Sequence, residues 1–123
     1  YDVFQVFDFA DPSILNGRRD QTVVAPQALF MMNSELVSNA ALQLARGILS
    51  GAGRTDVTRV DELFQIAFGR SPSAAESDAA VDYLRRYQQK AATVSPRAVD
   101  VPLKAWQSLC RATLAANEFI HLD

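Results

Sequence analysis

Two arginines and three aspartates near the N-terminus form the polar cluster with the clearest capacity for chemistry. Arg18 and Arg19 stand among Asp8, Asp11 and Asp20. A planar guanidinium binds a carboxylate or a backbone carbonyl through paired hydrogen bonds, so the cluster predicts an ion-pair network that ties the N-terminal segment to itself and to the following helix. One alternative is a site for an anionic sugar, a phosphate or a partner carboxylate. Another is a carboxylate-bound cation, although the Asp8-x-x-Asp11 spacing lacks the denser carboxylates and the glycine of a calcium loop.

Two amide side chains further along the chain are candidates for docking. Gln27 opens a long helical pattern, and Asn33 follows it two turns later beside the apolar run 29–32. We expect both amides to satisfy backbone groups of the N-terminal segment. The alternative is that the run, which contains Phe30 and two methionines, is a surface for a partner, because methionine adapts to varied shapes.

The single cysteine and the single histidine offer no catalytic or metal-binding set. Cys110 lies in an apolar helical stretch and is predicted to be a buried structural thiol. One cysteine excludes an intramolecular disulfide, a multi-cysteine zinc site and C-x-x-C-H haem attachment within this segment. His121 has no second histidine with which to share a metal. Since the motifs of serine hydrolases, P-loop proteins, zinc proteases and dinucleotide-binding enzymes are also missing, we predict a non-catalytic segment that binds no cofactor or metal.

Length and composition are those of one globular domain. The chain has 123 residues, of which 49% are hydrophobic and 21% charged, and a domain of this size can build a core without disulfides. Twelve basic and fourteen acidic residues give a net charge of −2, which disfavours nucleic-acid binding. No apolar run approaches the length of about 18 residues that spans a bilayer, so we expect no direct membrane insertion. The chain begins at Tyr1 without a signal-peptide pattern, and we predict a fragment of a larger protein.

The elements that must position these residues are predicted to be helices. The fold class is all-α, a four-helix bundle-like domain (residues 26–123) with an irregular extended N-terminal arm (residues 1–25). Apolar residues at helical spacing predict helices from Pro26 to about residue 49, over 56–68, over about 74–92, and from Asp100 to about residue 117.

Capping residues mark the ends of these helices. Thr55 or Asp56 is the expected N-cap of the second helix, and Gly69 ends it. Ser73 and Glu76 form a capping box before the third. In the arm, Val3, Phe7 and Phe9 are expected to anchor an extended segment on the bundle.

A family resemblance covers nearly the whole chain and is carried by segments 7–13, 17–19, 22–34, 69–72 with Glu76, 106–110 and 117–119. These segments resemble the C-terminal domain of unknown function in large planctomycete-type proteins, which commonly accompanies cytochrome-c-like haem domains. The resemblance implies an exported, multidomain context and a periplasmic or extracellular location, and it implies no particular reaction.

These observations lead to two functional hypotheses. The first is a non-catalytic helical scaffold or interaction module of a larger exported protein, whose partners are other domains of the parent chain or separate proteins. The second is an accessory domain of a redox or carbohydrate-processing assembly, with the chemistry in upstream domains and carbohydrate as a candidate ligand.

Overall fold

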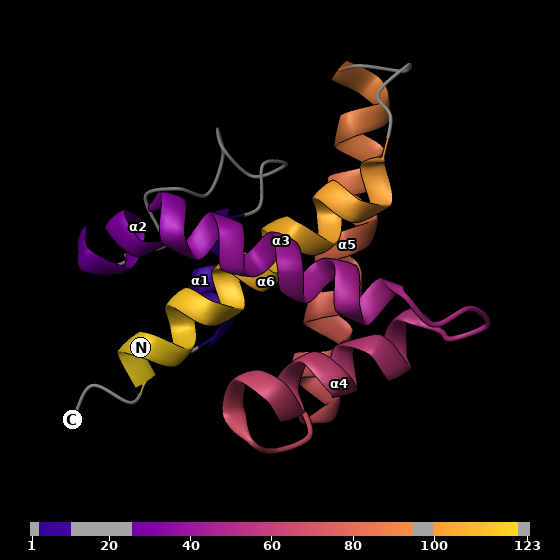
Figure 1. Ribbon diagram of the computed structural model, residues 1–123, viewed down its shortest axis with the longest axis horizontal. Coiled ribbons are helices and arrows are strands. Elements are labelled where there is room, and N and C mark those ends of the chain that lie inside the picture. The colour runs from indigo at the N-terminus through magenta and orange to yellow at the C-terminus, as the bar shows by residue number, and fades with distance from the viewer. Residues whose placement is uncertain (1–2, 11–25, 95–99, 121–123) are drawn as a thin grey trace.

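The computed structural model describes residues 3–10, 26–94 and 100–120 (Figure 1). Every regular element within these residues is an α-helix, which confirms the predicted all-α fold, and all four predicted helical stretches contain helix, although the first is divided in two. The helices are α1 (Val3–Ala10), α2 (Pro26–Met32), α3 (Glu35–Leu49), α4 (Asp56–Phe68), α5 (Ala74–Val94) and α6 (Val101–Ile120).

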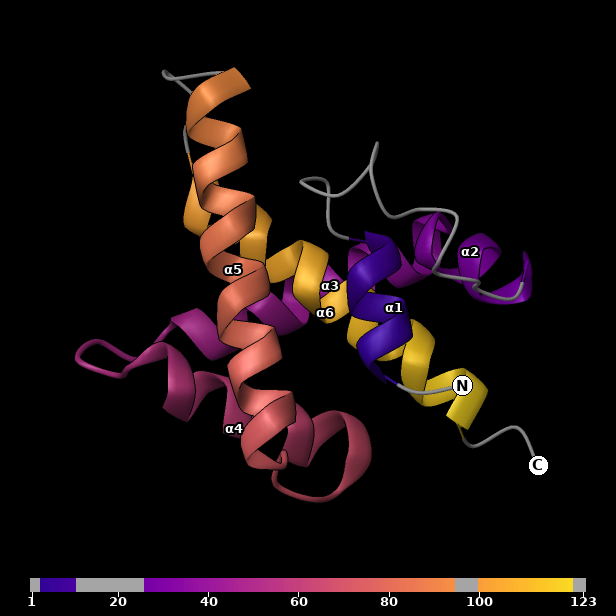
Figure 2. The same ribbon diagram turned by 180° about the vertical axis from the view of Figure 1, so that it is seen from behind.

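Helix α6 runs through the middle of the molecule, and every other described helix packs against it (Figures 1 and 2). The Trp106 side chain lies at the centre of this packing and is only 1% exposed. Small side chains on the buried face let the neighbouring helices approach closely. The buried residues of α6 are Ala105, Trp106, Ser108, Leu109, Cys110, Ala112, Thr113, Ala115 and Ala116. The helix continues to Ile120, so the predicted end near Asn117 is wrong.

The first described residues form a helix where the sequence predicts an extended arm. Val3, Val6 and Phe7 are buried, and their spacing of three and four residues places them on one helical face. This face packs against α5 and α6. The extended conformation predicted for residues 3–10 is therefore wrong, because burial of an amphipathic face stabilises a short helix that would be marginal alone. Residues 11–25 of the predicted arm lie outside the described residues.

The long helix predicted from Pro26 is divided into α2 and α3. Ser34 has extended backbone angles, φ −73° and ψ 144°, and its Oγ accepts a hydrogen bond from the Val37 N–H at 3.0 Å. A serine hydroxyl in this position caps a new helix instead of continuing the old one. Asn33 consequently lies in the turn between the two helices, and its predicted place inside a helix is wrong.

The predicted boundaries of α4 and α5 are confirmed at their caps. The Thr55 Oγ1 accepts a hydrogen bond from the Thr58 N–H at 3.2 Å at the start of α4. Gly69 ends α4 in the left-handed region with φ 70°. Helix α5 follows the capping box of Ser73 and Glu76 and extends to Val94, two residues beyond the predicted end. Its C-terminal half and the start of α6 project together from the body of the molecule (Figures 1 and 2).

Candidate functional site

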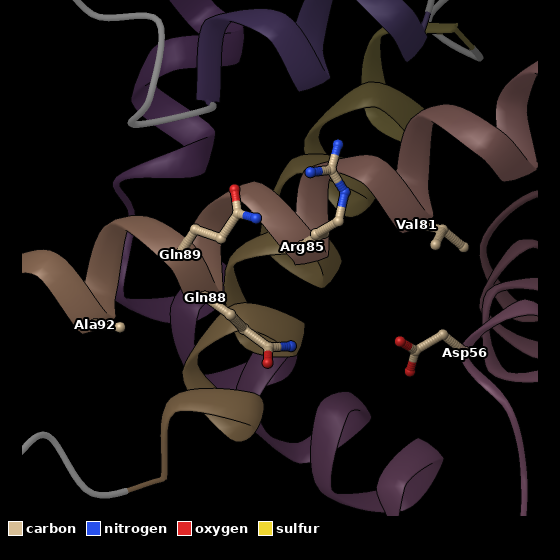
Figure 3. A pocket seen from close by; sticks show the side chains of 6 residues that line it. All are labelled: Asp56, Val81, Arg85, Gln88, Gln89 and Ala92. Atoms are coloured by element: carbon tan, nitrogen blue, oxygen red, sulfur yellow. The ribbon is translucent and has the colours of Figure 1, made fainter. Parts of the chain in front are cut away.

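A groove with a volume of about 520 Å³ lies between α5 and the start of α4 (Figure 3). Its lining residues on α5 recur every three or four positions and therefore form one face of that helix. From the first to the last of them, the rise of the helix gives a length of about 16 Å. The ends of the face are apolar and its middle is polar. The lining consists of Asp56 from α4, together with Val81, Arg85, Gln88, Gln89 and Ala92 from α5.

The start of α4 brings Asp56 to this groove. Thr55 caps the helix, so Asp56 stands in the first turn, where unpaired backbone N–H groups favour a negative charge. Two contacts across the preceding loop hold this corner. Arg54 forms an ion pair with Glu62, and the Arg59 guanidinium donates a hydrogen bond to the Gly51 carbonyl at 2.8 Å.

On α5, the arginine of the groove is already engaged by a neighbouring carboxylate. Asp82 forms an ion pair with Arg85 and a second one with Arg86, whose Nε lies 2.9 Å from the Asp82 Oδ2. In contrast, Asp56 forms no ion pair within the part of the chain that the structure describes. The Gln88 amide and the Asp56 carboxylate point into the same space (Figure 3). The groove thus offers one carboxylate, two amides that can donate and accept hydrogen bonds, and an ion-paired arginine, which are groups suited to binding a ligand.

A second polar cluster joins α4 to α5 through the turn between them. The guanidinium of Arg70 binds both carboxylate oxygens of Glu76, at 2.8 and 3.0 Å, and lies 5.8 Å from the centroid of the Phe64 ring. The Glu76 carboxylate also accepts the Ser73 N–H at 2.8 Å. The hydrogen bond from Arg70 lowers the pKa of Glu76, against the opposing effect of burial, and Ser73 lowers it further. Each of these contacts lies within the chain, so the cluster is structural.

A third polar group lies in the interior between α1, α5 and α6. The Tyr83 hydroxyl hydrogen-bonds to the Ser108 hydroxyl and donates to the Ala10 carbonyl at 3.3 Å. The Tyr83 and Phe7 rings lie 6.1 Å apart, centroid to centroid. These bonds satisfy buried polar groups that would otherwise be costly and fix the end of α1 on the bundle.

The cluster predicted around Arg18 and Arg19 falls largely outside the described residues. Asp8 lies on α1 and is half-buried. Arg18, Arg19, Asp11 and Asp20 belong to the segment 11–25, so the ion-pair network and its alternatives remain predictions.

The two predicted docking amides are both on the surface. Gln27 on α2 and Asn33 in the following turn are exposed, and the segment to which we expect them to bind lies outside the described residues. Beside them, Phe30 is 75% and Leu36 is 80% exposed, so this corner also presents apolar side chains to solvent.

Cys110 is buried, as predicted, and burial raises the pKa of its thiol to about 12. The described residues contain no group of three or more His, Cys, Asp or Glu side chains arranged to hold a metal ion. None of the described helices has the length and hydropathy required to cross a bilayer.

Neither the groove nor the pair of Arg70 and Glu76 is among the features predicted from the sequence. The periodic placement of Arg85, Gln88 and Gln89 off the buried face of α5 is the available signal for one side of the groove. An arginine shortly before a capping box is the corresponding signal for the ion pair. Neither pattern indicates which other element completes the site.

The chain has a family match over its first two-thirds. The model of the family PSD1, described as a protein of unknown function (DUF1553), matches residues 1–84. The predicted domain of unknown function is thereby confirmed, while the planctomycete-type origin and the cytochrome-c-like neighbours remain predictions. No curated protein and no solved structure matches the chain.

Proposed function

The chain belongs to the PSD1 family of proteins of unknown function (DUF1553), and we propose that it is a non-catalytic helical interaction module of a larger exported protein. The observation that carries this proposal is the groove between α4 and α5. It combines apolar contact area with amide groups and with a carboxylate that has no ion-pair partner among the described residues. A protein segment that binds in a groove makes contacts with groups of these kinds.

The interior supports the same proposal because its polar groups serve the fold. Glu76, Ser108 and Thr113 are buried, and each is hydrogen-bonded within the chain: Glu76 to Arg70, Ser108 to Tyr83, and Thr113 to the Leu109 carbonyl. Polar side chains that stabilise helix packing are poorly placed to react with a substrate. We therefore place the function of the described domain on its surface.

The proposed location, periplasmic or extracellular, and the proposed larger multidomain protein both rest on the motif resemblance in the sequence. In this setting the partner is another domain of the parent chain or a separate protein.

Site-specific photo-crosslinking in the parent protein, produced in its natural host, tests the proposal. A benzophenone amino acid is placed at Gln89 in the groove, at Leu36 on the α2–α3 corner, and at exposed Asp78 as the control. We expect a covalent adduct from Gln89 that mass spectrometry assigns to another domain or protein. Adducts from Leu36 alone would show that the interaction surface is the α2–α3 corner and not the groove. No adduct above the Asp78 level at either position would contradict an interaction module.

A further inference from the structure

We propose that the groove between α4 and α5 binds a protein segment that carries an arginine or lysine side chain, which Asp56 and Gln88 receive. This proposal rests on the proposed interaction function and names the chemistry of the partner. It follows from the charge, the geometry and the apolar ends of the groove.

The charged group that faces the middle of the groove beside Gln88 is Asp56, which favours a cationic ligand. Arg85 is ion-paired with Asp82, which also binds Arg86. Among the described residues, Asp56 has no such partner, and it is the acidic residue of the lining. A bound cation would therefore pair with Asp56, whereas the Arg85 guanidinium points away from the space between Asp56 and Gln88 (Figure 3).

The geometry provides more than one acceptor for the donors of that cation. The amide of Gln88 and the carboxylate of Asp56 converge from two different helices on the same space (Figure 3). A carboxylate and an amide carbonyl together accept several N–H donors, which matches the five donors of a guanidinium or the three of an ammonium.

The apolar ends of the groove favour a chain segment over a free ion. Val81 and Ala92 flank the polar middle of the α5 face and are separated by a helical rise of about 16 Å. A peptide can place small apolar side chains at both ends while its basic side chain lies in the middle.

A display selection with random 16-residue peptides tests this partner chemistry on the 123-residue chain. The same library is selected against the unchanged chain, against Asp56→Asn and Gln88→Ala, and against Asp78→Asn, which removes an exposed carboxylate of α5 outside the groove. Circular dichroism of each variant establishes that it is folded. Because Gln88→Ala retains a good helix former, it tests the groove even if Asp56→Asn destabilises α4.

We expect the selected peptides to be enriched in arginine or lysine next to small apolar residues. Their affinity should fall by about threefold to tenfold for Asp56→Asn, the range of a partly exposed ion pair, and should be unchanged for Asp78→Asn. Enrichment of acidic or purely apolar peptides would overturn the partner chemistry while leaving an interaction module intact. The same holds if basic peptides bind Asp56→Asn and Gln88→Ala as tightly as they bind the unchanged chain. A library without any enriched peptide would overturn the groove as a peptide site, and the crosslinking yields would then decide the proposed function separately.

Discussion

The hydroxyl of Tyr83 on α5 and the hydroxyl of Ser108 on α6 form a hydrogen bond in the interior of the domain. Both residues are buried, and Tyr83 also reaches the Ala10 carbonyl at the end of α1. One side chain thus connects the N-terminal helix α1 with the last two helices, α5 and α6.

Removal of the Tyr83 hydroxyl should deprive the Ser108 hydroxyl and the Ala10 carbonyl of a hydrogen-bond partner. We expect Tyr83→Phe to lower the free energy of unfolding by about 1–3 kcal/mol, which is the cost of unsatisfied buried polar groups. The double variant with Ser108→Ala should cost less than the sum of the two single variants, because both changes remove the same bond. Urea denaturation of the four proteins measures this coupling, and strictly additive effects would contradict the shared hydrogen bond.

The ion pair of Arg70 and Glu76 should matter more than the surface ion pairs of the same domain. The Glu76 side chain is 11% exposed, whereas the Glu62 side chain in the pair with Arg54 is 36% exposed. We expect Glu76→Gln to destabilise the domain by about 1–2 kcal/mol, since the charged capping contacts are lost, and Glu62→Gln by less than about 1 kcal/mol. Urea melts at neutral pH compare the two variants. Equal losses would show that the partial burial of Glu76 has no energetic consequence.

The free energy of unfolding should depend on pH through the ionisation of Glu76. The pKa of Glu76 is lowered in the folded state, chiefly by its hydrogen bond from Arg70, so the folded state favours the ionised form. The resulting stabilisation is present above the usual glutamate pKa of about 4.3 and is lost as the pH falls through the lower folded value. The difference in unfolding free energy between the unchanged chain and Glu76→Gln should therefore narrow below about pH 4. A difference that is constant from neutral to strongly acidic pH would argue against this assignment.

Local signals explain which elements the sequence could predict. Thr55, Gly69 and the capping box of Ser73 and Glu76 act within one turn of their own helix, and the structure confirms each of them. The break at Ser34 is obscured because the apolar pattern continues on both sides of it, although the capping bond from Val37 to Ser34 is as local as the one from Thr58 to Thr55.

Tertiary relationships explain what the sequence could not predict. The spacing of Val3, Val6 and Phe7 fits one helical face, but so short a helix is marginal alone, and burial of this face against distant helices stabilises it. The groove has the same origin, because Asp56 meets Gln88 only after α4 and α5 have packed together. Spacing along one helix indicates a face, but the partner of that face depends on the complete fold.

Two glycines should respond to alanine substitution with opposite signs. Gly69 has φ 70° and open space where a methyl group would lie, so Gly69→Ala should cost about 1–2 kcal/mol from backbone strain alone. Gly47 lies within α3, also with open space, and Gly47→Ala should stabilise the domain by about 0.5–1 kcal/mol because alanine favours the helix. Thermal and urea melts of both variants provide the measurement. Effects of the same sign would contradict either the left-handed cap or the helical position.

The matched family segment should not fold without the helix that follows it. The family match ends at Leu84, yet α6 supplies Trp106 and Leu109 to the core and contacts every other described helix. A chain that ends at Leu84 should show weak helical circular dichroism and no cooperative melting transition, because α1, α2 and α3 lose the surface against which they bury their apolar faces. A chain that ends at Ile120 is the matched control and should melt cooperatively. Cooperative unfolding of residues 1–84 alone would place the centre of the core outside α6.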